Sequence, residues 1–392
     1  MTFKKLIGKL HLWLGFISGL LVLFLGLTGC ILAYQREIED ATQGYRYVEP
    51  RPQAYLPPTQ LRQFADQALP GKHIHSLSYA HGKASQAVYF SFDPEYYYIV
   101  YLDPYTGQVL KNKDMSQDFF RFIINGHYYL WLPPNVGQPI LASATLIFVF
   151  MLISGIVLWW PKNKAARKQR FTIKWNAKWR RVNYDAHNVV GFYVSWVAIF
   201  LALTGLVMGF KWFAGSVYWA ASGGKQLVEF YEPLSQVPAG VKTANMPAVD
   251  KLWLQKIQTV DLATGQLEMH FPETPASSIE TAYNPDPSTY WKTDYQYYDQ
   301  HSLQELSVTH QYGRFKGASV ADKIMRMNYD IHVGAIGGLA GKTIAFFASL
   351  FAASLPVTGF LIWWGRRKKS KKNGQPAPAE RTRTKAKELV RP

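Results

Sequence analysis

Four long apolar stretches interrupt an otherwise polar chain of 392 residues. They cover about residues 10–34, 138–160, 184–210 and 339–364. An α-helix of about 20 residues is long enough to cross the ~30 Å hydrocarbon layer of a membrane. The second and fourth stretches end in Trp-Trp pairs followed by basic residues, which is typical of a membrane–water interface. The pattern predicts an integral membrane protein whose membrane part is an all-α, four-helix transmembrane bundle.

Two polar segments, residues 35–120 and 211–325, separate the first span from the second and the third from the fourth. The first segment contains a polar helical stretch and then Tyr- and Val-rich runs at 87–92 and 97–102 that suit strands. Residues 103–107, Asp-Pro-Tyr-Thr-Gly, are typical of a turn between strands. The second segment has similar alternating and aromatic runs. The pattern in each segment therefore predicts a small α+β domain, and both domains are expected on one side of the membrane.

Basic residues beside the spans indicate the orientation of the chain. The net charge is +17, and residues 1–10, 161–182 and 365–392 hold 23 of the 43 basic residues but 2 of the 26 acidic ones. Lys and Arg next to transmembrane helices mark the cytoplasmic side. Both termini are therefore expected in the cytoplasm. The same distribution argues against nucleic acid as a partner, because such binding needs a basic patch on a folded domain.

These observations predict the organisation of the whole chain. It comprises a cytoplasmic N-terminus (1–9), a first transmembrane helix (10–34), an outer domain (35–120), an outer lead-in with the second helix (121–160), a basic cytoplasmic loop (161–182), a third helix (183–210), a second outer domain (211–325), a lead-in with the fourth helix (326–364) and a basic cytoplasmic tail (365–392). The tail after Lys372 is charged and contains prolines, so we expect it to be disordered.

The two halves of the chain share motifs. His11 and His187 each begin a His-x3-Gly motif, and each precedes the glycine of a Leu-Thr-Gly motif by 18 residues. The second and fourth spans share the motif Ser/Thr-Gly-x3-Trp-Trp, at 154–160 and 358–364. Since both halves start on the same side, the pattern indicates internal duplication as two parallel repeats.

The first span has a second interpretation. Lys4 and Lys5 precede the apolar run, and residues 27–30, Leu-Thr-Gly-Cys, fit a lipoprotein cleavage site at Cys30. The run is long for a signal peptide, and Leu-Thr-Gly recurs in the third span, where cleavage is impossible. We therefore expect a retained membrane anchor.

Four of the ten histidines, His11, His127, His187 and His332, lie at or just before the start of a different span. Ionisable residues at membrane depth are costly and are commonly functional. Helix direction places His11 with His187 near the cytoplasmic face and His127 with His332 near the outer face. The alternative is that each is an ordinary interfacial residue. His73 and His75 in the first outer segment would share one face of a strand and are a further, weaker metal-binding candidate.

Two facing imidazoles are what six-coordinate haem iron requires. Copper or zinc would need further ligands, and the four spans contain no Glu and only one Asp, Asp185 at the start of the third. The histidines therefore predict two haem groups per chain, with these four residues as axial ligands. Possible partners of the haem propionates are Arg180 and Arg181 on the inner side and Arg121, Arg314 and Arg326 on the outer side, although these arginines also suit surface or topology roles.

The His-x3-Gly helix, the Asp-Pro-x-Thr-Gly hairpin and the Gly-x3-Trp-Trp end of the second span resemble the PepSY-associated transmembrane helix family, over about residues 3–370. The resemblance implies PepSY-like periplasmic domains and a place in the bacterial inner membrane, with iron-regulated ferric-siderophore reductases that carry two b-type haems among the relatives. Where relatives have a Leu-His-Arg-like motif, this chain has Asn-Gly-His-Tyr at 125–128, which leaves the depth of His127 open and suits a short outer helix. The second outer domain departs most from the family pattern and is expected to be a remnant.

The expected function is electron transfer across the membrane that reduces ferric iron in siderophores or another metal chelate. The cytoplasmic segments are too short for a flavin or nicotinamide domain, so a membrane quinol or a separate reductase must donate the electrons. PepSY domains are also associated with inhibiting or regulating peptidases. A non-redox, membrane-anchored binding protein, such as a peptidase inhibitor or an accessory to siderophore uptake, is therefore the alternative.

Overall fold

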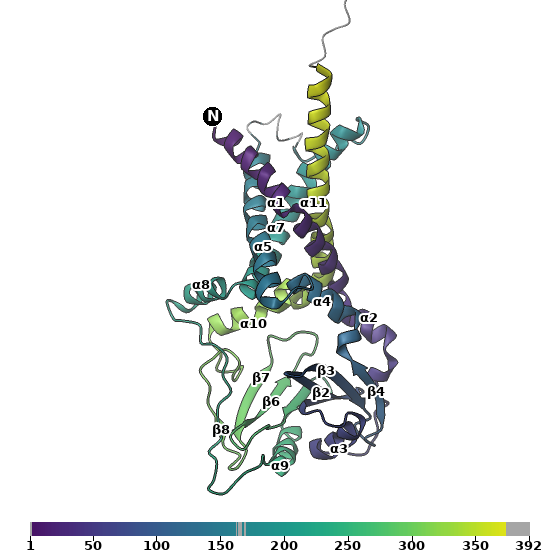
Figure 1. Cartoon of the computed structure of the whole chain (residues 1–392), viewed down its shortest axis with the longest axis vertical. Helices are drawn as coiled ribbons and strands as arrows, with labels where there is room; N and C mark the ends of the chain where they lie inside the picture. The colour runs from purple at the N-terminus through teal and green to yellow at the C-terminus, as the bar shows by residue number, and fades with distance from the viewer. Residues whose placement is uncertain (1, 162, 164–166, 168–169, 374–392) are drawn as a thin grey trace, which may run out of the picture.

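Four long helices form a bundle at one end of the molecule, and the strands lie at the other end (Figure 1). The computed structural model describes residues 2–161, 163, 167 and 170–373. The long helices are α1 (Phe3–Ala33), α5 (Pro134–Trp159), α7 (Trp179–Gly209) and α11 (Gly338–Asn373). Each is long and apolar enough to cross a membrane, which confirms the four predicted spans. Part of the predicted basic loop and most of the predicted disordered tail (374–392) lie outside the described residues.

Small residues let the helices of the bundle approach closely. A Cβ atom on Gly26 of α1 would stand 2.7 Å from the Ser349 carbonyl of α11, and one on Gly209 of α7 would stand 2.8 Å from the Ala142 Cβ of α5. Large apolar side chains such as Leu20 and Phe200 are instead exposed on the outside of the bundle. Small residues inside and apolar residues outside are the arrangement expected for helices that pack in lipid. The chain is thus a multi-pass membrane protein.

The two polar segments form one antiparallel sheet, which corrects the prediction of two separate small domains. Its eight strands lie in the order β4-β3-β2-β1-β5-β6-β7-β8. The strands are β1 (Ile74–Ala80), β2 (Ser85–Phe92), β3 (Glu95–Leu102), β4 (Val109–Asp114), β5 (Gln266–His270), β6 (Ser278–Asn284), β7 (Asp294–Asp299) and β8 (Glu305–Leu306). The halves join where β1 pairs with β5, with Leu77 opposite Met269.

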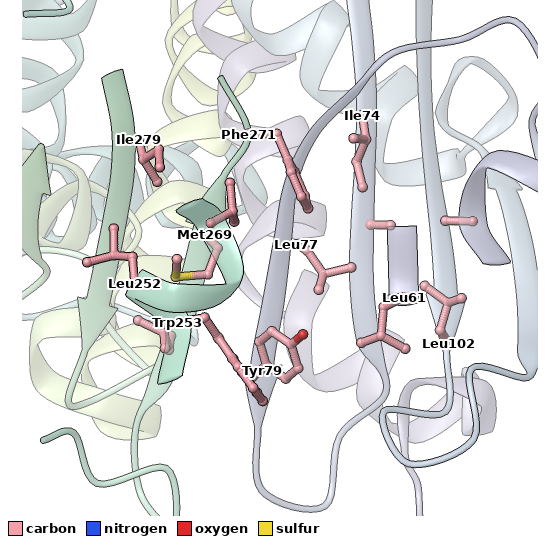
Figure 2. Packing of buried hydrophobic residues seen from close by; sticks show 14 of the residues in the cluster. Leu61, Ile74, Leu77, Tyr79, Leu102, Leu252, Trp253, Met269, Phe271 and Ile279 are labelled. Atoms are coloured by element: carbon pink, nitrogen blue, oxygen red, sulfur yellow. The ribbon is translucent and has the colours of Figure 1, made fainter. Parts of the chain in front are cut away.

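One apolar core crosses this seam. Helices α3 (Pro58–Ala68) and α9 (Met246–Ile257) cover the same face of the sheet, and the core residues gather there, as Figure 2 shows for Leu77, Trp253 and Met269. Trp253 of α9 reaches Tyr79 of β1 in the other half, with ring centres 5.4 Å apart. The second outer segment, with its own helix and strands, is therefore not a remnant.

Short helices connect the bundle to the sheet (Figure 1). They are α2 (Gln35–Thr42), α4 (Phe119–Tyr129), α8 (Lys211–Ser222) and α10 (Val320–His332), with 3-10 turns at Gly44–Arg46, Met115–Gln117 and Ala335–Gly337. Helix α4 begins at Asp118, whose side chain accepts from the Arg121 N–H, and α10 begins with a reciprocal cap between Ser319 and Asp322. In both halves the order is long helix, short helices, four strands, short helix and long helix.

Candidate functional site

The four histidines predicted at the starts of the spans lie near the two ends of the bundle. His11 and His187 are in the third turns of α1 and α7, at the end of the bundle where both helices begin. His127 and His332 are not in the long helices. His127 is near the end of α4 and His332 is the last residue of α10, so both reach the bundle from the connecting layer. The sequence indicated a short outer helix for His127 but gave no sign of one for His332.

His127 and His332 form a pair at the sheet end of the bundle. Their ring centres are 6.3 Å apart, and the ring planes make an angle of 62°. Metal–imidazole bonds of about 2.0 Å, together with roughly 1.1 Å from each bonded nitrogen to its ring centre, put two rings about 6 Å apart across one metal ion. The spacing therefore suits two axial ligands of a single iron.

His11 and His187 lie at the opposite end, on α1 and α7, which both pack against α5 and α11. In both pairs, one histidine comes from the first half of the chain and the other from the second half. Any group held between the histidines would therefore sit at the interface of the two halves.

A cavity of about 190 Å³ lies beside the His127–His332 pair. Most of its lining is apolar or small, including Gly29, Gly205 and Ala352, while Tyr128 and Tyr329 add two hydroxyl groups. Within the described ranges, no group of three or more His, Cys, Asp or Glu side chains is placed to hold a bare metal ion. Two imidazoles in such a pocket suit a metal that brings its own equatorial ligands, as haem iron does.

Burial keeps the outer histidines neutral. It lowers the pKa of His127 to about 3, where the neighbouring His332 adds a smaller effect. It likewise lowers the pKa of His332 to about 4, against a smaller opposing effect of the Leu201 carbonyl. A neutral imidazole has a free nitrogen lone pair, which is the form that ligates metals.

Each of the four histidines lies against a Ser or Thr residue and against the glycine that follows this Ser or Thr in the sequence. The distances from histidine Nδ1 to the hydroxyl oxygen are 2.8 Å for His11 and Ser154, 2.8 Å for His127 and Thr28, 2.8 Å for His187 and Thr358, and 3.0 Å for His332 and Thr204. A Cβ atom on the following glycine would stand 3.4 to 3.7 Å from Cε1 of the same histidine. We call these four Ser/Thr-Gly pairs the histidine cradles.

Sequence reasoning missed the histidine cradles, although their signal was present. Thr28-Gly29 and Thr204-Gly205 are the Leu-Thr-Gly motifs, and Ser154-Gly155 and Thr358-Gly359 are the motif shared by the second and fourth spans. The repetition was visible, but the contact of each pair with a histidine exists only in three dimensions. Within each half, the two long helices supply both cradles.

Two of the arginines predicted as propionate partners make other contacts in the structure. Arg326 is buried, and its guanidinium donates to the carbonyls of Gln311, Thr293 and Gly313, so its prediction as an outer propionate partner is wrong. Arg314 forms salt bridges on the sheet, because its guanidinium nitrogens lie 3.4 Å from the carboxylate oxygens of both Asp294 and Glu305.

The other three arginines stay predictions. Arg121 is exposed on α4, and its guanidinium lies 5.3 Å from the ring centre of Tyr97. At the other end, Arg181 pairs with Asp185 at 2.9 Å, and Arg180 lies beside Gly365 of α11.

His73 and His75, the metal-binding candidates of the first outer segment, are arranged differently from the prediction. His73 precedes β1, so it does not share a strand with His75. His75 instead contacts His270 of β5, with ring centres 4.7 Å apart. Glu268 lies 3.6 Å from His270 on the same strand. This second histidine pair marks the seam between the two halves of the sheet.

Comparison with known proteins agrees with this architecture. The family model of the PepSY-associated TM region matches residues 9–366, a range that contains all four histidines and the whole sheet. No curated protein matches the sequence. The chain belongs to the family of proteins with the PepSY-associated TM region.

Proposed function

We propose that the protein is a di-haem b oxidoreductase that moves electrons across the bacterial inner membrane to ferric iron in a siderophore or another metal chelate. The observation that carries this proposal is the His127–His332 pair, with ring centres 6.3 Å apart beside a cavity at the sheet end. His11 and His187 would hold the second haem at the other end.

The two sites have a separation that suits transmembrane transfer. His11 and Gly29, which contacts His127, are 18 residues apart on α1 and therefore about 27 Å apart along the helix axis. His187 and Gly205 of α7 have the same spacing. The hydrocarbon layer is ~30 Å thick, so two groups held near its two faces form a path from one side to the other.

The orientation follows from charge. The start of α1 and the end of α11 lie at the end of the bundle away from the sheet (Figure 1), and this end carries basic residues that flank the spans, such as Lys4, Arg180 and Arg366. Because Lys and Arg favour the cytoplasmic side, the termini are cytoplasmic and the sheet is periplasmic in this proposal. The reduction of the chelate then takes place on the sheet side.

The residues of the chain would bind each haem and shield it from water, while the haem would supply reversible one-electron chemistry at its iron. The histidines would hold the iron, and the apolar lining of the cavity would keep water and other charges away from it. The donor is a membrane quinol or a separate reductase. One quinol releases two electrons and two protons, and the two electrons convert two Fe(III) chelates to Fe(II).

Visible spectroscopy of the purified protein tests this function. We expect a difference spectrum, reduced minus oxidised, of b-type haem at two haems per chain. Addition of a ferric chelate to the reduced protein should return the oxidised spectrum and release Fe(II), trapped by a ferrous-specific dye. The absence of haem absorption in folded protein that was supplied with haem would contradict the proposal and favour the non-redox binding role.

A further inference from the structure

Four hydroxyl groups in the bundle each donate their single proton in a hydrogen bond to a backbone carbonyl of their own helix. Thr28 Oγ1 donates to the Phe24 carbonyl at 2.8 Å, and Thr204 Oγ1 donates to the Phe200 carbonyl at 2.7 Å. Thr358 Oγ1 donates to the Ser354 carbonyl at 3.0 Å, and Ser154 Oγ donates to the Met151 carbonyl at 3.1 Å. Such bonds to the preceding turn are usual for Ser and Thr in helices. The hydroxyl oxygen is then left with lone pairs only.

A hydroxyl in this state can accept a hydrogen bond from the histidine but cannot donate one. The neighbouring Nδ1 atoms at 2.8 to 3.0 Å must therefore carry the proton. One histidine gives separate support. Nδ1 of His332 lies 3.0 Å from the Leu201 carbonyl. A carbonyl oxygen is only ever an acceptor, so it also requires a protonated Nδ1.

We infer that Thr28, Ser154, Thr204 and Thr358 are positioning residues that fix their histidines as the Nδ1–H tautomer and so direct an unprotonated Nε2 at the metal. The inference rests on the proposed haem function for its purpose, but its geometry belongs to the chain alone. The same geometry recurs at all four histidines, and each of the four long helices supplies one of the hydroxyl groups.

The glycine of each histidine cradle completes the arrangement. A Cβ atom at Gly205 would stand 3.4 Å from His332 Cε1, and one at Gly359 would stand 3.4 Å from His187 Cε1. These are contact distances, so any longer side chain would push the ring out of place. The hydroxyl therefore sets the rotation and the protonated atom of the ring, and the glycine sets its depth.

The chemical consequence is control of the ligand. A hydrogen bond from Nδ1–H to a fixed acceptor orients a metal-bound imidazole and raises its basicity, and loss of such a partner typically weakens metal binding about 10- to 100-fold. The acceptors also tune the reduction potential of haem iron. The histidine cradles would thus set both the occupancy and the potential of each site.

The tautomer can be measured without a bound cofactor. We would label histidine with ¹⁵N in the full-length protein, purify it without a haem supply, and assign the signals of His127 and His332 by their Ala variants. Solid-state NMR separates protonated from unprotonated ring nitrogens. We expect both residues to carry the proton on Nδ1. A signal from protonated Nε2 would overturn the inference even if the protein binds haem, whereas a correct tautomer in a protein that never binds haem would leave the inference standing and remove the function.

Hydroxyl substitutions test the positioning role in the haem-loaded protein. Thr28→Val removes the acceptor of His127 at nearly constant shape, and we expect it to lower occupancy of the sheet-end site about 10-fold and to shift the potential and low-spin EPR signal of the remaining haem. Thr28→Ser should restore both. Ser18→Ala is the control, because Ser18 is buried in the same helix and donates to the Leu14 carbonyl, but no hydrogen bond joins it to a histidine of the described residues. Equal occupancy, potential and EPR signal in Thr28→Val and wild type would overturn the inference.

Discussion

His127 and His332 come from opposite halves of the chain, yet their ring centres lie 6.3 Å apart at the sheet end of the bundle. Neither residue belongs to a long helix. His127 lies near the end of α4 and His332 ends α10, two short helices between the bundle and the sheet. The relative position of the two rings therefore depends on how the sheet holds α4 and α10.

Two arginines connect these helices to the sheet. Arg121 of α4 lies 5.3 Å from the ring centre of Tyr97 on β3, and Arg326 of α10 lies 5.6 Å from that of Tyr295 on β7. Each arginine precedes the histidine of its helix by six residues. Because β3 and β7 belong to one continuous sheet, the sheet ties the two halves of the histidine pair together.

A larger residue at a cradle glycine should empty one site. We expect Gly205→Leu to displace His332, because its side chain would extend beyond a Cβ that already stands 3.4 Å from His332 Cε1. Haem content, measured by visible absorption, should fall from two to one per chain. Gly215→Leu in α8 is the matched control, since its Cβ would meet no atom within 4 Å. Full occupancy in Gly205→Leu would show that the glycine does not limit the depth of the ring.

Loss of the Arg326 side chain should destabilise the sheet side of the protein. Arg326→Met removes a donor from three carbonyls: Gly313 keeps the Tyr295 N–H, whereas Thr293 and Gln311 lose the guanidinium, and each such loss at a buried group costs about 1–3 kcal/mol. We expect a clearly lower midpoint of thermal unfolding, followed by circular dichroism in detergent. Arg121→Met is the control, because Arg121 is exposed and a cation–π contact at an exposed site contributes about 0.5–1 kcal/mol. Similar midpoints for the two variants would refute this view of Arg326.

The sheet should lose stability in mild acid through His75. Burial, with a smaller effect of His270, lowers the pKa of His75 from 6.5 to about 4. Between these values the unfolded chain binds the proton and the folded chain does not, so the free energy of unfolding falls as the pH is lowered from 6.5 towards 4.

His75→Gln should reduce this acid dependence, which can be measured as the difference from wild type in urea unfolding at pH 7 and pH 4.5. The comparison with wild type matters because burial raises the pKa of Glu280, which acts in the opposite direction and remains in both proteins. An identical pH dependence in the two proteins would show that His75 does not contribute.

The sequence predicts the bundle far better than the sheet. Each span is a local apolar run, and the alternation of helix direction was enough to sort the four histidines by depth. The pairing of Ser76 with His270 joins residues far apart in the chain, and no local pattern encodes the register between them. The role of Arg326 was also hidden, because a basic residue near a span looks the same whether it faces a ligand or three backbone carbonyls.

The most direct test of the central claim is the haem content of the four His→Ala variants, measured by difference spectra and potentials. We predict that His127→Ala and His332→Ala lose one and the same haem, and that His11→Ala and His187→Ala lose the other. Loss in any other pairing, or retention of both haems in His332→Ala, would contradict the account.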